Sequence, residues 1–306
     1  MSKNFVEAKN LCKRYGNVVA LDGVTFTSDA KLLALVGPNG AGKTTFIKIS
    51  TCLLRPTNGH LKILGYDVSK ECNLLKERIS LMPQDANPDT ACTPFEHIVY
   101  YLFSRGYKLS ESKRRAREIL EKIGLWEYRD EKCLKLSGGM KKMVLLAMAF
   151  APEVNAVFLD EPTAGLDPVN RVKIWGLIAR LAREGVHVLV TSHNMEEVEE
   201  YAEEVVMINR GKIVIQGSPR ELIDTISNLM RIEITLKDGK MSKDLLKMFR
   251  NIDGTRGVYN LESTVIIYVD KNDVSEIAEK LSQMDINIAM KIWKCNLKDV
   301  FLRHVL

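Results

Sequence analysis

Short, mainly apolar runs recur along the first two-thirds of the chain, each followed by a polar or glycine-rich segment. Leu32–Val36 and Ala156–Leu159 are apolar throughout, whereas Ile79–Met82 and Val186–Val190 each contain one polar residue. Runs of four or five apolar residues without alternation are typical of strands buried on both faces, as in a parallel sheet. Segments with apolar residues at helical spacing lie between the runs, and this alternation predicts an α/β fold.

Residues 5–26 are expected to form short strands around a turn at Tyr15-Gly16-Asn17. A further turn at Arg55–Gly59 precedes an alternating strand at His60–Leu64. Between residues 86 and 155 the pattern becomes helical, and this stretch predicts a helical insertion within the α/β core.

Three helices are expected in that insertion. Thr93 to Glu96 form a capping box with proline at the first helical position. A second helix is expected from a cap at Ser110 to Gly124, and a third from Ser137 to Phe150.

The core pattern continues beyond the insertion. A helix after Pro168 is expected to end at Gly185, directly before the last core strand, and an acidic helix is expected at Glu196–Glu204. The apolar face of the first of these helices would hold Val172, Trp175, Ile178 and Ala179.

The pattern changes after Gly217-Ser218-Pro219, and we expect two domains, 1–219 and 220–306. The second domain follows the order strand, helix, strand, strand, helix, strand, which fits a ferredoxin-like α+β unit. A terminal amphipathic helix is expected at Leu297–Val305. The strands are expected at 232–236, near Val258, at Val265–Val269 and at Ile286–Ile292, and the helices at Leu245–Phe249 and Val274–Leu281.

Composition is that of an ordinary globular protein: 46% of the 306 residues are hydrophobic and 27% are charged. The net charge of +5 neither requires nor excludes a polyanionic partner. The six cysteines are scattered, which favours free thiols in a reducing compartment. No apolar run approaches the length of a membrane helix, so a membrane role requires a separate partner. A basic cluster at 113–117 lacks interleaved aromatic residues and is interpreted as a solvated face.

The stretch Gly37–Thr45, G-P-N-G-A-G-K-T-T, directly follows the apolar run Leu32–Val36 and precedes a helical segment. Glycines allow successive backbone N–H groups to turn towards an anion, and the helix start adds partial positive charge. Lysine and threonine follow, suited to the β and γ phosphates and to Mg²⁺. The residues expected to contact nucleotide are therefore Gly37, Pro38, Asn39, Gly40, Ala41, Gly42, Lys43, Thr44 and Thr45.

A second potential anion-binding terminus occurs at Ser137-Gly138-Gly139, where a serine N-cap and two glycines open an apolar helix. By itself this pattern is better explained as a plain helix cap.

Polar side chains also stand where the apolar runs end. Asp160 and Glu161 follow one run, and because neighbouring side chains on a strand point to opposite faces, they cannot share one task. At the carboxyl edge of a parallel sheet, Asp160 can face Mg²⁺ while Glu161 addresses a water molecule. Gln84 and His193 follow two other runs and could reach a metal ion and a γ-phosphate. Tyr15 could stack on a base or simply pack on a domain edge.

Together these motifs resemble the nucleotide-binding subunits of ABC transporters over about the first 219 residues. The resemblance places the motifs in the family's order: Tyr15 (A-loop), Gly37–Thr45 (Walker A), Gln84 (Q-loop), Leu136–Met140 (signature), Asp160 and Glu161 (Walker B), Asp167 (D-loop) and His193 (switch).

Two features are similar to the exporter-type branch that includes drug, sodium and antibiotic exporters. They are Met140, where Gln is commoner, and the tail Leu297–Leu302, similar to "L-x-D-V-F-L". The stretch Ser28–Lys31 departs from the family's usual Gly-Glu turn.

The resemblance implies a P-loop NTPase core with an antiparallel β-subdomain, and an active ATPase. Two copies would close head to tail on ATP, each supplying Ser137, Gly138, Gly139 and Asp167 to its partner's nucleotide. Lys43 and His193 would contact the γ-phosphate, and Glu161 would activate water. Thr44, Asp160 and Gln84 would bind Mg²⁺. Gln84 would also report the presence of the γ-phosphate to integral-membrane permease subunits. The protein would be cytoplasmic and peripheral on the inner face of the membrane.

Several alternatives remain at this point. An importer subunit is the nearest, since only Met140 and the tail favour export. A non-transport ABC ATPase acting on nucleic acid or the ribosome would be favoured by tandem cassettes, a long coiled-coil insertion or zinc motifs, which are absent, so no nucleic-acid partner is expected. A nucleotide kinase would lack the signature helix. Residues 220–306 could support the dimer or regulate it.

Overall fold

The computed structural model describes residues 4–236, 243–261, 264–283 and 288–305. The chain divides into two compact units, Met1–Ser218 and Pro219–Leu306. This division lies one residue before the expected boundary. Across the described ranges, every helix is too short or too polar to cross a bilayer. All six cysteines are free thiols.

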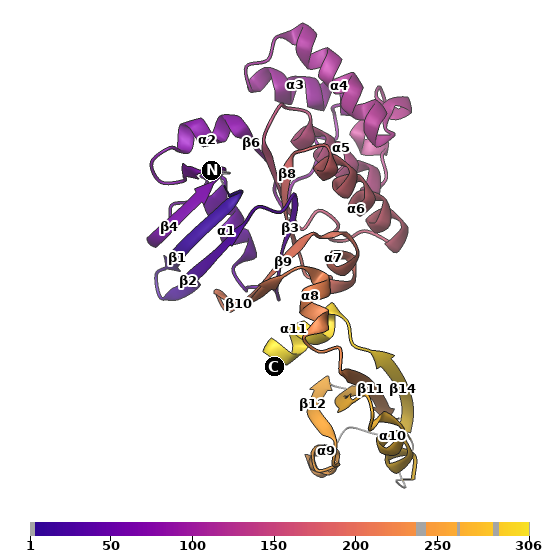
Figure 1. Ribbon diagram of the computed structural model, residues 1–306. Helices are drawn as coiled ribbons and strands as arrows, with labels where there is room; N and C mark the ends of the chain where they lie inside the picture. Colours follow the sequence, from indigo (N-terminus) through magenta and orange to yellow (C-terminus); the bar gives the residue numbers. More distant parts are fainter. Residues whose placement is uncertain (1–3, 237–242, 262–263, 284–287, 306) are drawn as a thin grey trace. The chain divides into compact units, whose positions relative to one another are not determined.

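A six-stranded sheet with the order β10-β9-β3-β8-β7-β6 forms the centre of unit 1 (Figure 1). Neighbouring strands from β9 to β6 are parallel, and only β10 is antiparallel to its neighbour. Every residue of β3 and β7 is buried, as the uninterrupted apolar runs predict. The strands are β3 (Leu32–Val36), β6 (Ile79–Met82), β7 (Ala156–Asp160), β8 (His187–Ser192), β9 (Glu204–Asn209) and β10 (Lys212–Gly217).

Two expectations at the end of this sheet are wrong. Helix α7 (Met195–Tyr201) ends three residues before Glu204, because Ala202 adopts an extended conformation. Strand β9 then pairs with β3, so the run at Val186–Val190 is not the last core strand. The glutamates continue through residues 203 and 204, and composition therefore does not mark where the helix gives way to the strand.

A second sheet, with the order β2-β1-β4-β5, is antiparallel. Helix α1 (Lys43–Ser50) contributes Phe46, Ile47 and Ile49 to a single core that also contains buried residues of both sheets. This core fixes the start of α1 against the end of β3. The strands are β1 (Val6–Tyr15), β2 (Val18–Ser28), β4 (Asn58–Ile63) and β5 (Tyr66–Asp67), and α2 (Cys72–Arg78) leads into β6.

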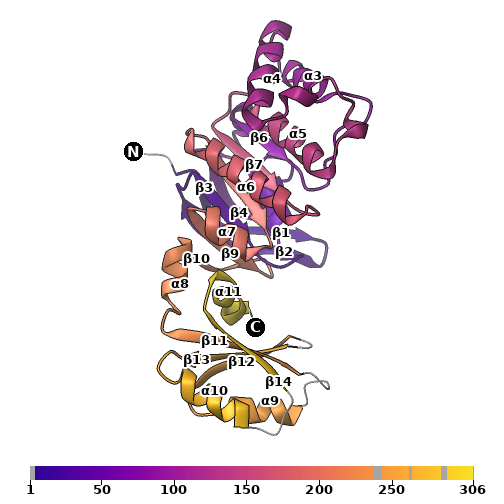
Figure 2. The ribbon, with the colours of Figure 1, turned by 90° about the vertical axis from the view of Figure 1, so that its right-hand side faces the viewer.

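Helices α3 (Pro94–Ser104), α4 (Leu109–Ile123) and α5 (Gly138–Phe150) gather at one end of unit 1 (Figures 1 and 2). The capping box at Thr93 is present, since its hydroxyl accepts from the N–H of Glu96 and the Glu96 carboxylate accepts from the N–H of Thr93. The expected cap at Ser110 is wrong. Lys108 occupies the N-cap position of α4 without a side-chain cap, so that Ser110 lies inside the helix.

Three of the four basic residues in the cluster on α4 have acidic partners nearby. Arg114, Arg115 and Arg117 pair with Glu118, Glu111 and Glu121, each four residues away. Helix α6 (Pro168–Arg183) buries Trp175, Ile178 and Ala179 as expected. Val172 is 58% exposed, so its assignment to the apolar face of this helix is wrong. Two single-turn 3₁₀ helices, Trp126–Tyr128 and Cys133–Lys135, connect α4 to α5.

Unit 2 contains a four-stranded antiparallel sheet with the order β12-β13-β11-β14. With α9 after β11 and α10 after β13, this is a split βαβ, ferredoxin-like arrangement. Phe249 of α9 and Ile277 and Leu281 of α10 pack on one face of the sheet, whereas α11 lies on the other face (Figure 2). The expected strand at Ile286–Ile292 begins outside the described residues. The elements are α8 (Pro219–Asp224), β11 (Leu229–Leu236), α9 (Lys243–Arg250), β12 (Thr255–Leu261), β13 (Thr264–Asp270), α10 (Val274–Gln283), β14 (Ile288–Lys294) and α11 (Leu297–Val305).

A buried carboxylate ties α11 to the sheet of unit 2. Asp299 is fully buried and accepts hydrogen bonds from the Tyr268 hydroxyl at 2.6 Å and from Arg231 Nη1 at 3.1 Å. It also accepts from the Asn296 N–H at 2.8 Å, while the Asn296 side chain caps α11 by accepting from the Asp299 N–H. Burial, followed by the hydrogen bond to Asp299, raises the pKa of Tyr268 far above its usual value, so the phenol stays a donor.

Candidate functional site

The glycine loop joins the carboxyl end of β3 to the start of α1. Gly40 has φ +78° and Gly42 has φ +110°, angles that side chains oppose. Space is also closed at two positions: a Cβ on Gly37 would lie 2.1 Å from Ile208 O, and one on Gly42 would lie 2.5 Å from Ala20 O. The neighbouring strands β9 and β2 therefore require glycine at these positions, and the loop backbone stays uncovered.

Lys43, the first residue of α1, is only 5% exposed. Its Nζ donates to Gly37 O at 2.9 Å and to Pro38 O at 3.2 Å, and it lies 3.2 Å from Glu161 Oε1. A desolvated ammonium is thus held at the loop between backbone carbonyls and one carboxylate. An incoming phosphate would find this cation already oriented.

A cavity of about 330 Å³ opens at this loop. The expected residues Asn39 to Thr45 line it, together with Gln84 and Glu161. Three residues that sequence reasoning missed complete the lining: Val18, Val19 and Ala20 of β2. A signal for them was present, because two valines directly after a polar turn form an exposed apolar pair, and Val18 is 66% exposed.

Tyr15 is the last residue of β1 and is 46% exposed, but it does not line the cavity. The ammonium of Lys13 lies 5.2 Å from the centre of its ring. The base-stacking role of Tyr15 therefore stays a prediction, whereas Val18 and Val19 do provide apolar surface in the cavity lining.

The ends of β7 and β8 are joined by a chain of short hydrogen bonds. Asp160 Oδ1 accepts from the Thr191 hydroxyl at 2.6 Å, and the same hydroxyl accepts from the Glu161 N–H at 2.9 Å. Glu161 has φ +49°, an angle that costs a non-glycine residue about 1–3 kcal/mol. Thr191 thus holds the turn that aims the two acids apart. Sequence reasoning did not single it out, although it is the β8 residue paired with Asp160.

The Glu161 carboxylate is 6% exposed and has two basic partners. His193 Nδ1 donates to Glu161 Oε2 at 2.7 Å, and Lys43 Nζ approaches Oε1 at 3.2 Å. The structure therefore brings together three of the four expected catalytic side chains, and the fourth, Gln84, lines the same cavity. A carboxylate oriented in this way can accept a proton from a water molecule.

Oxygen donors that suit Mg²⁺ occur at the cavity. Thr44 and Gln84 line it, and Asp160 lies directly beside Glu161 but is 2% exposed and does not line it. Among the residues that the structure describes, no three His, Cys, Asp or Glu side chains converge on a metal position. These three residues fit a metal whose remaining ligands are phosphate and water oxygens, because they offer hard oxygen donors and few charges.

The second potential anion-binding terminus, at Ser137-Gly138-Gly139, lies outside this cavity. Ser137 caps α5 by accepting from the Met140 N–H at 3.2 Å, so the cap exists as predicted. A Cβ on Gly138 would meet nothing within 4 Å, whereas one on Gly139 would lie 2.6 Å from the Asn170 side chain. Neither Ser137 nor the two glycines line the cavity of the phosphate loop.

Asp167 is also absent from the cavity lining and caps α6. Its carboxylate accepts from the N–H of Asn170 at 3.1 Å and from the Asn170 side-chain amide, and these hydrogen bonds lower its pKa. Lys142 of α5 donates to Gln84 O at 3.3 Å, and burial lowers the pKa of Lys142. This contact, which sequence reasoning missed, links the Ser137 helix to the strand end that carries Gln84.

Known proteins are similar to this chain in sequence and in fold. A model of the ABC transporter family matches residues 21–164. The daunorubicin/doxorubicin resistance ATP-binding protein DrrA of Streptomyces peucetius is 33% identical over 231 residues, which cover 75% of this chain and 70% of that protein. The Nod factor export ATP-binding protein I of Burkholderia orbicola is 32% identical over 306 residues, which cover 99% and 97%.

Solved structures agree with these relatives. An ATP-binding subunit of an ABC transporter matches with a TM-score of 0.63 and 26% identity, covering 72% of this chain and 92% of that one. A dimeric ATP-binding cassette in a post-hydrolysis state, bound to ADP and Pi, matches with a TM-score of 0.62 and 25% identity, covering 70% and 98%. The chain therefore belongs to the family of ABC transporter ATP-binding proteins and is an ABC ATPase.

Proposed function

We propose that this chain powers export through separate membrane subunits, and that two copies close head to tail around ATP. The observation that carries the proposal is the separation of the phosphate loop from the capped helix start at Ser137. The phosphate loop forms one wall of a cavity, and the capped start of α5 at Ser137 does not line that cavity. A second copy would place its own Ser137 helix over the nucleotide held by the first copy, so each site would be completed by its partner.

The roles of the side chains follow from their positions. Glu161 accepts the proton of the attacking water, and His193 and Lys43 hold its carboxylate and contact the γ-phosphate. Thr44, Asp160 and Gln84 would hold Mg²⁺, which neutralises phosphate charge when bound. Thr191 keeps Asp160 and Glu161 aimed at different tasks. In phosphoryl transfer to water, most of the rate enhancement comes from positioning the reactants and stabilising the charge of the transition state.

The base is proposed to lie over the apolar surface of Val18 and Val19, with Tyr15 as a stacking partner. The exposed Val18 side chain, which is part of the cavity wall, would stabilise the purine ring by apolar contact. It offers no hydrogen bond that would distinguish one purine base from another.

Complementation between two inactive variants tests the shared sites. Lys43→Ala removes the loop cation, whereas Gly138→Glu places a carboxylate at the helix start that faces the partner's nucleotide. The latter variant should fold, because a side chain at Gly138 meets nothing within 4 Å and acids favour helix starts. We expect each variant alone to hydrolyse ATP poorly and an equal mixture to regain activity, since a mixed dimer contains one intact site.

Steady-state phosphate release from the two pure variants and from their mixture is the measurement. Wild-type hydrolysis by Gly138→Glu alone would contradict a role of the α5 start in the site. Gly106→Glu, at another glycine whose Cβ would meet nothing, is a control for the added charge, although its φ of +92° requires a check of thermal stability.

Export is supported by the relatives, which are named as drug resistance and Nod factor export proteins. A permease contact surface is proposed at a groove of about 270 Å³ between β6 and α3. Leu53 on its rim is 61% exposed, and Tyr100 and Phe103 of α3 are 59% and 60% exposed. Strand β6 forms the groove floor through Ile79 and Leu81 and ends two residues before Gln84. A membrane partner seated there would contact the strand that leads to the nucleotide, and the chain would lie on the cytoplasmic face of the membrane.

Recovery of the chain with membranes tests this surface. Leu53→Glu combined with Phe103→Glu should release the protein from the membrane fraction and from the multispanning protein that co-purifies with it. Each substitution places a carboxylate where the apolar side chain would have packed against the membrane partner. ATP-binding affinity of the isolated chain should not change. Met248→Glu, at an apolar position on α9 that is 50% exposed, is the control. Undiminished membrane recovery of the double variant would contradict the groove as the contact surface.

A further inference from the structure

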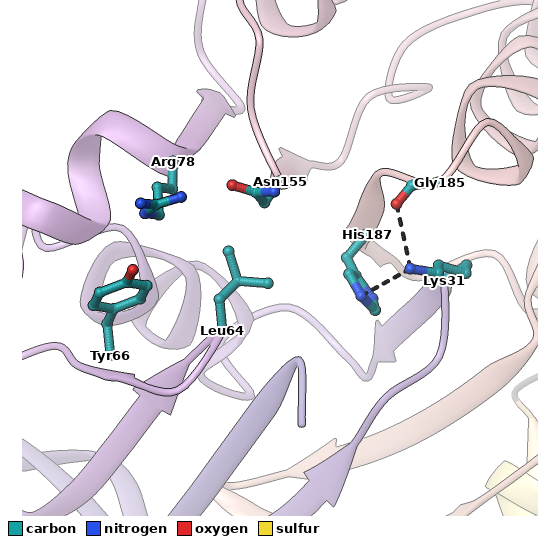
Figure 3. Close-up of a pocket in the computed structure, with 7 residues that line it drawn as sticks. All are labelled: Lys31, Leu64, Tyr66, Arg78, Asn155, Gly185 and His187. Atoms are coloured by element: carbon teal, nitrogen blue, oxygen red, sulfur yellow. Dashed lines mark hydrogen bonds between the residues drawn. The ribbon is translucent and has the colours of Figure 1, made fainter. Parts of the chain in front are cut away.

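A second cavity of unit 1, of about 340 Å³, lies at the opposite edge of the parallel sheet (Figure 3). Lys31, Arg78 and Asn155 directly precede β3, β6 and β7, and His187 is the first residue of β8. The carboxyl ends of the same four strands carry the phosphate loop, Gln84, Glu161 and His193. The length of the sheet therefore separates this cavity from the nucleotide site. It is lined by Lys31, Leu64, Tyr66, Arg78, Asn155, Gly185 and His187.

The lining contains two permanent cations, Lys31 and Arg78, and no carboxylate. Neither cation forms an ion pair with any residue that the structure describes, although all three arginines on α4 do. The nearest acid in contact is Glu203, and it accepts from the backbone N–H of Lys31 at 2.8 Å rather than from the ammonium. The cavity therefore carries positive charge that the protein itself does not neutralise.

Lys31 is held in place by neutral groups. Its Nζ donates to Gly185 O at 3.2 Å and to His187 Nε2 at 3.0 Å (Figure 3). His187 Nδ1 in turn donates to Ala30 O at 3.0 Å, and the ring stacks on Phe5 with centroids 4.7 Å apart. The imidazole thus presents its lone pair to the ammonium, which orients the cation without removing its charge.

The other side of the cavity is built around Arg78. Its guanidinium lies 5.5 Å from the centre of the Tyr66 ring, and Asn155 and Leu64 complete the wall between it and Lys31 (Figure 3). A guanidinium on a ring face keeps its planar N–H fork free for an oxyanion, which it can bind through two parallel hydrogen bonds. The carboxamide of Asn155 adds a neutral donor.

We propose that this cavity binds a small phosphate-bearing anion at a site separate from the ATP site. The planar fork of Arg78 matches the oxygens of a phosphate group, and the ammonium of Lys31 on the opposite wall adds positive charge that favours a dianion over a monoanion such as chloride. Leu64 and the Tyr66 ring provide apolar contact for an organic group.

Nuclear magnetic resonance of the full-length chain labelled at histidine tests the site. His187 and His193 report the two cavities separately, and their signals are assigned with His187→Gln and His193→Gln. Sodium phosphate and glycerol 3-phosphate are titrated at constant ionic strength, with the nucleotide site filled by ADP and Mg²⁺. We expect a saturable shift of the His187 signal with either probe, and tighter binding of glycerol 3-phosphate, because its carbon chain can contact Leu64 and Tyr66.

Lys31→Gln and Arg78→Gln should each raise the dissociation constant for the phosphate probe, read from the His187 signal, by about tenfold or more. Lys113→Gln makes the same charge change at an exposed position of α4 and should leave it unchanged. Both cavity variants change exposed or half-exposed side chains, and their melting temperatures without phosphate show whether they fold. A linear, non-saturating shift of His187, or equal affinity in the wild type and both cavity variants, would overturn the proposal.

Discussion

Replacing Glu161 with Gln is expected to lower ATP hydrolysis by about 10²–10⁴-fold while ATP binding persists. The amide keeps the size of the side chain and can still bond to His193, but it cannot accept the proton of the attacking water. The phosphate loop and the buried Lys43 are unchanged by this substitution, and loss of the ion pair with Lys43 leaves that cation available to the nucleotide.

Phosphate release and nucleotide binding are measured on the same preparation. Glu196→Gln, a carboxylate exposed on α7, should hydrolyse ATP at the wild-type rate. Undiminished hydrolysis by the Glu161 variant would show that another group activates water.

Asp299→Ala is expected to destabilise unit 2 by about 3–5 kcal/mol, because it leaves Arg231, whose side chain is only 13% exposed, without its carboxylate. The substitution also removes the acceptor of the Tyr268 hydroxyl and half of the capping box that starts α11. Because the chain has two units, the free energy of unfolding of unit 2 cannot be obtained from a single unfolding transition of the whole chain.

Hydrogen exchange followed by mass spectrometry resolves the two units. Amides of β11, β13 and α11 should exchange about 10²-fold or more faster in the Asp299 variant, and those of the six-stranded sheet should not change. Asp253→Ala, an exposed acid of the same unit, is the control. Unchanged protection of β11 and β13 would show that Asp299 is dispensable for the packing of α11.

The phosphate loop could be predicted from sequence because its geometry is local. A buried strand, glycines with positive φ and a helix start occur in adjacent residues, and the closed space at Gly37 and Gly42 shows why no other residue fits. The strand ends at Gln84, Asp160 and His193 were found by the same reasoning, since a parallel sheet brings carboxyl ends to one edge.

Contacts between distant segments could not be predicted in this way. Val18 and Val19 reach the cavity only because β2 packs beside the loop, and Thr191 acts through the pairing of β8 with β7. The acid at Asp299 was recognised as part of a family tail, but its role in holding Arg231 and Tyr268 depends on the sheet of unit 2. The second cavity could not be predicted either, because it is formed where the starts of four strands, distant in the sequence, lie side by side.

The central claim, that each nucleotide site requires a second copy of the chain, is tested most directly by the solution mass of the Glu161→Gln variant. Light scattering should give the 34.6 kDa monomer without nucleotide and twice that mass with ATP and Mg²⁺, and Gly138→Glu in the same chain should abolish the increase. A variant that binds ATP and stays monomeric at every concentration would contradict the claim.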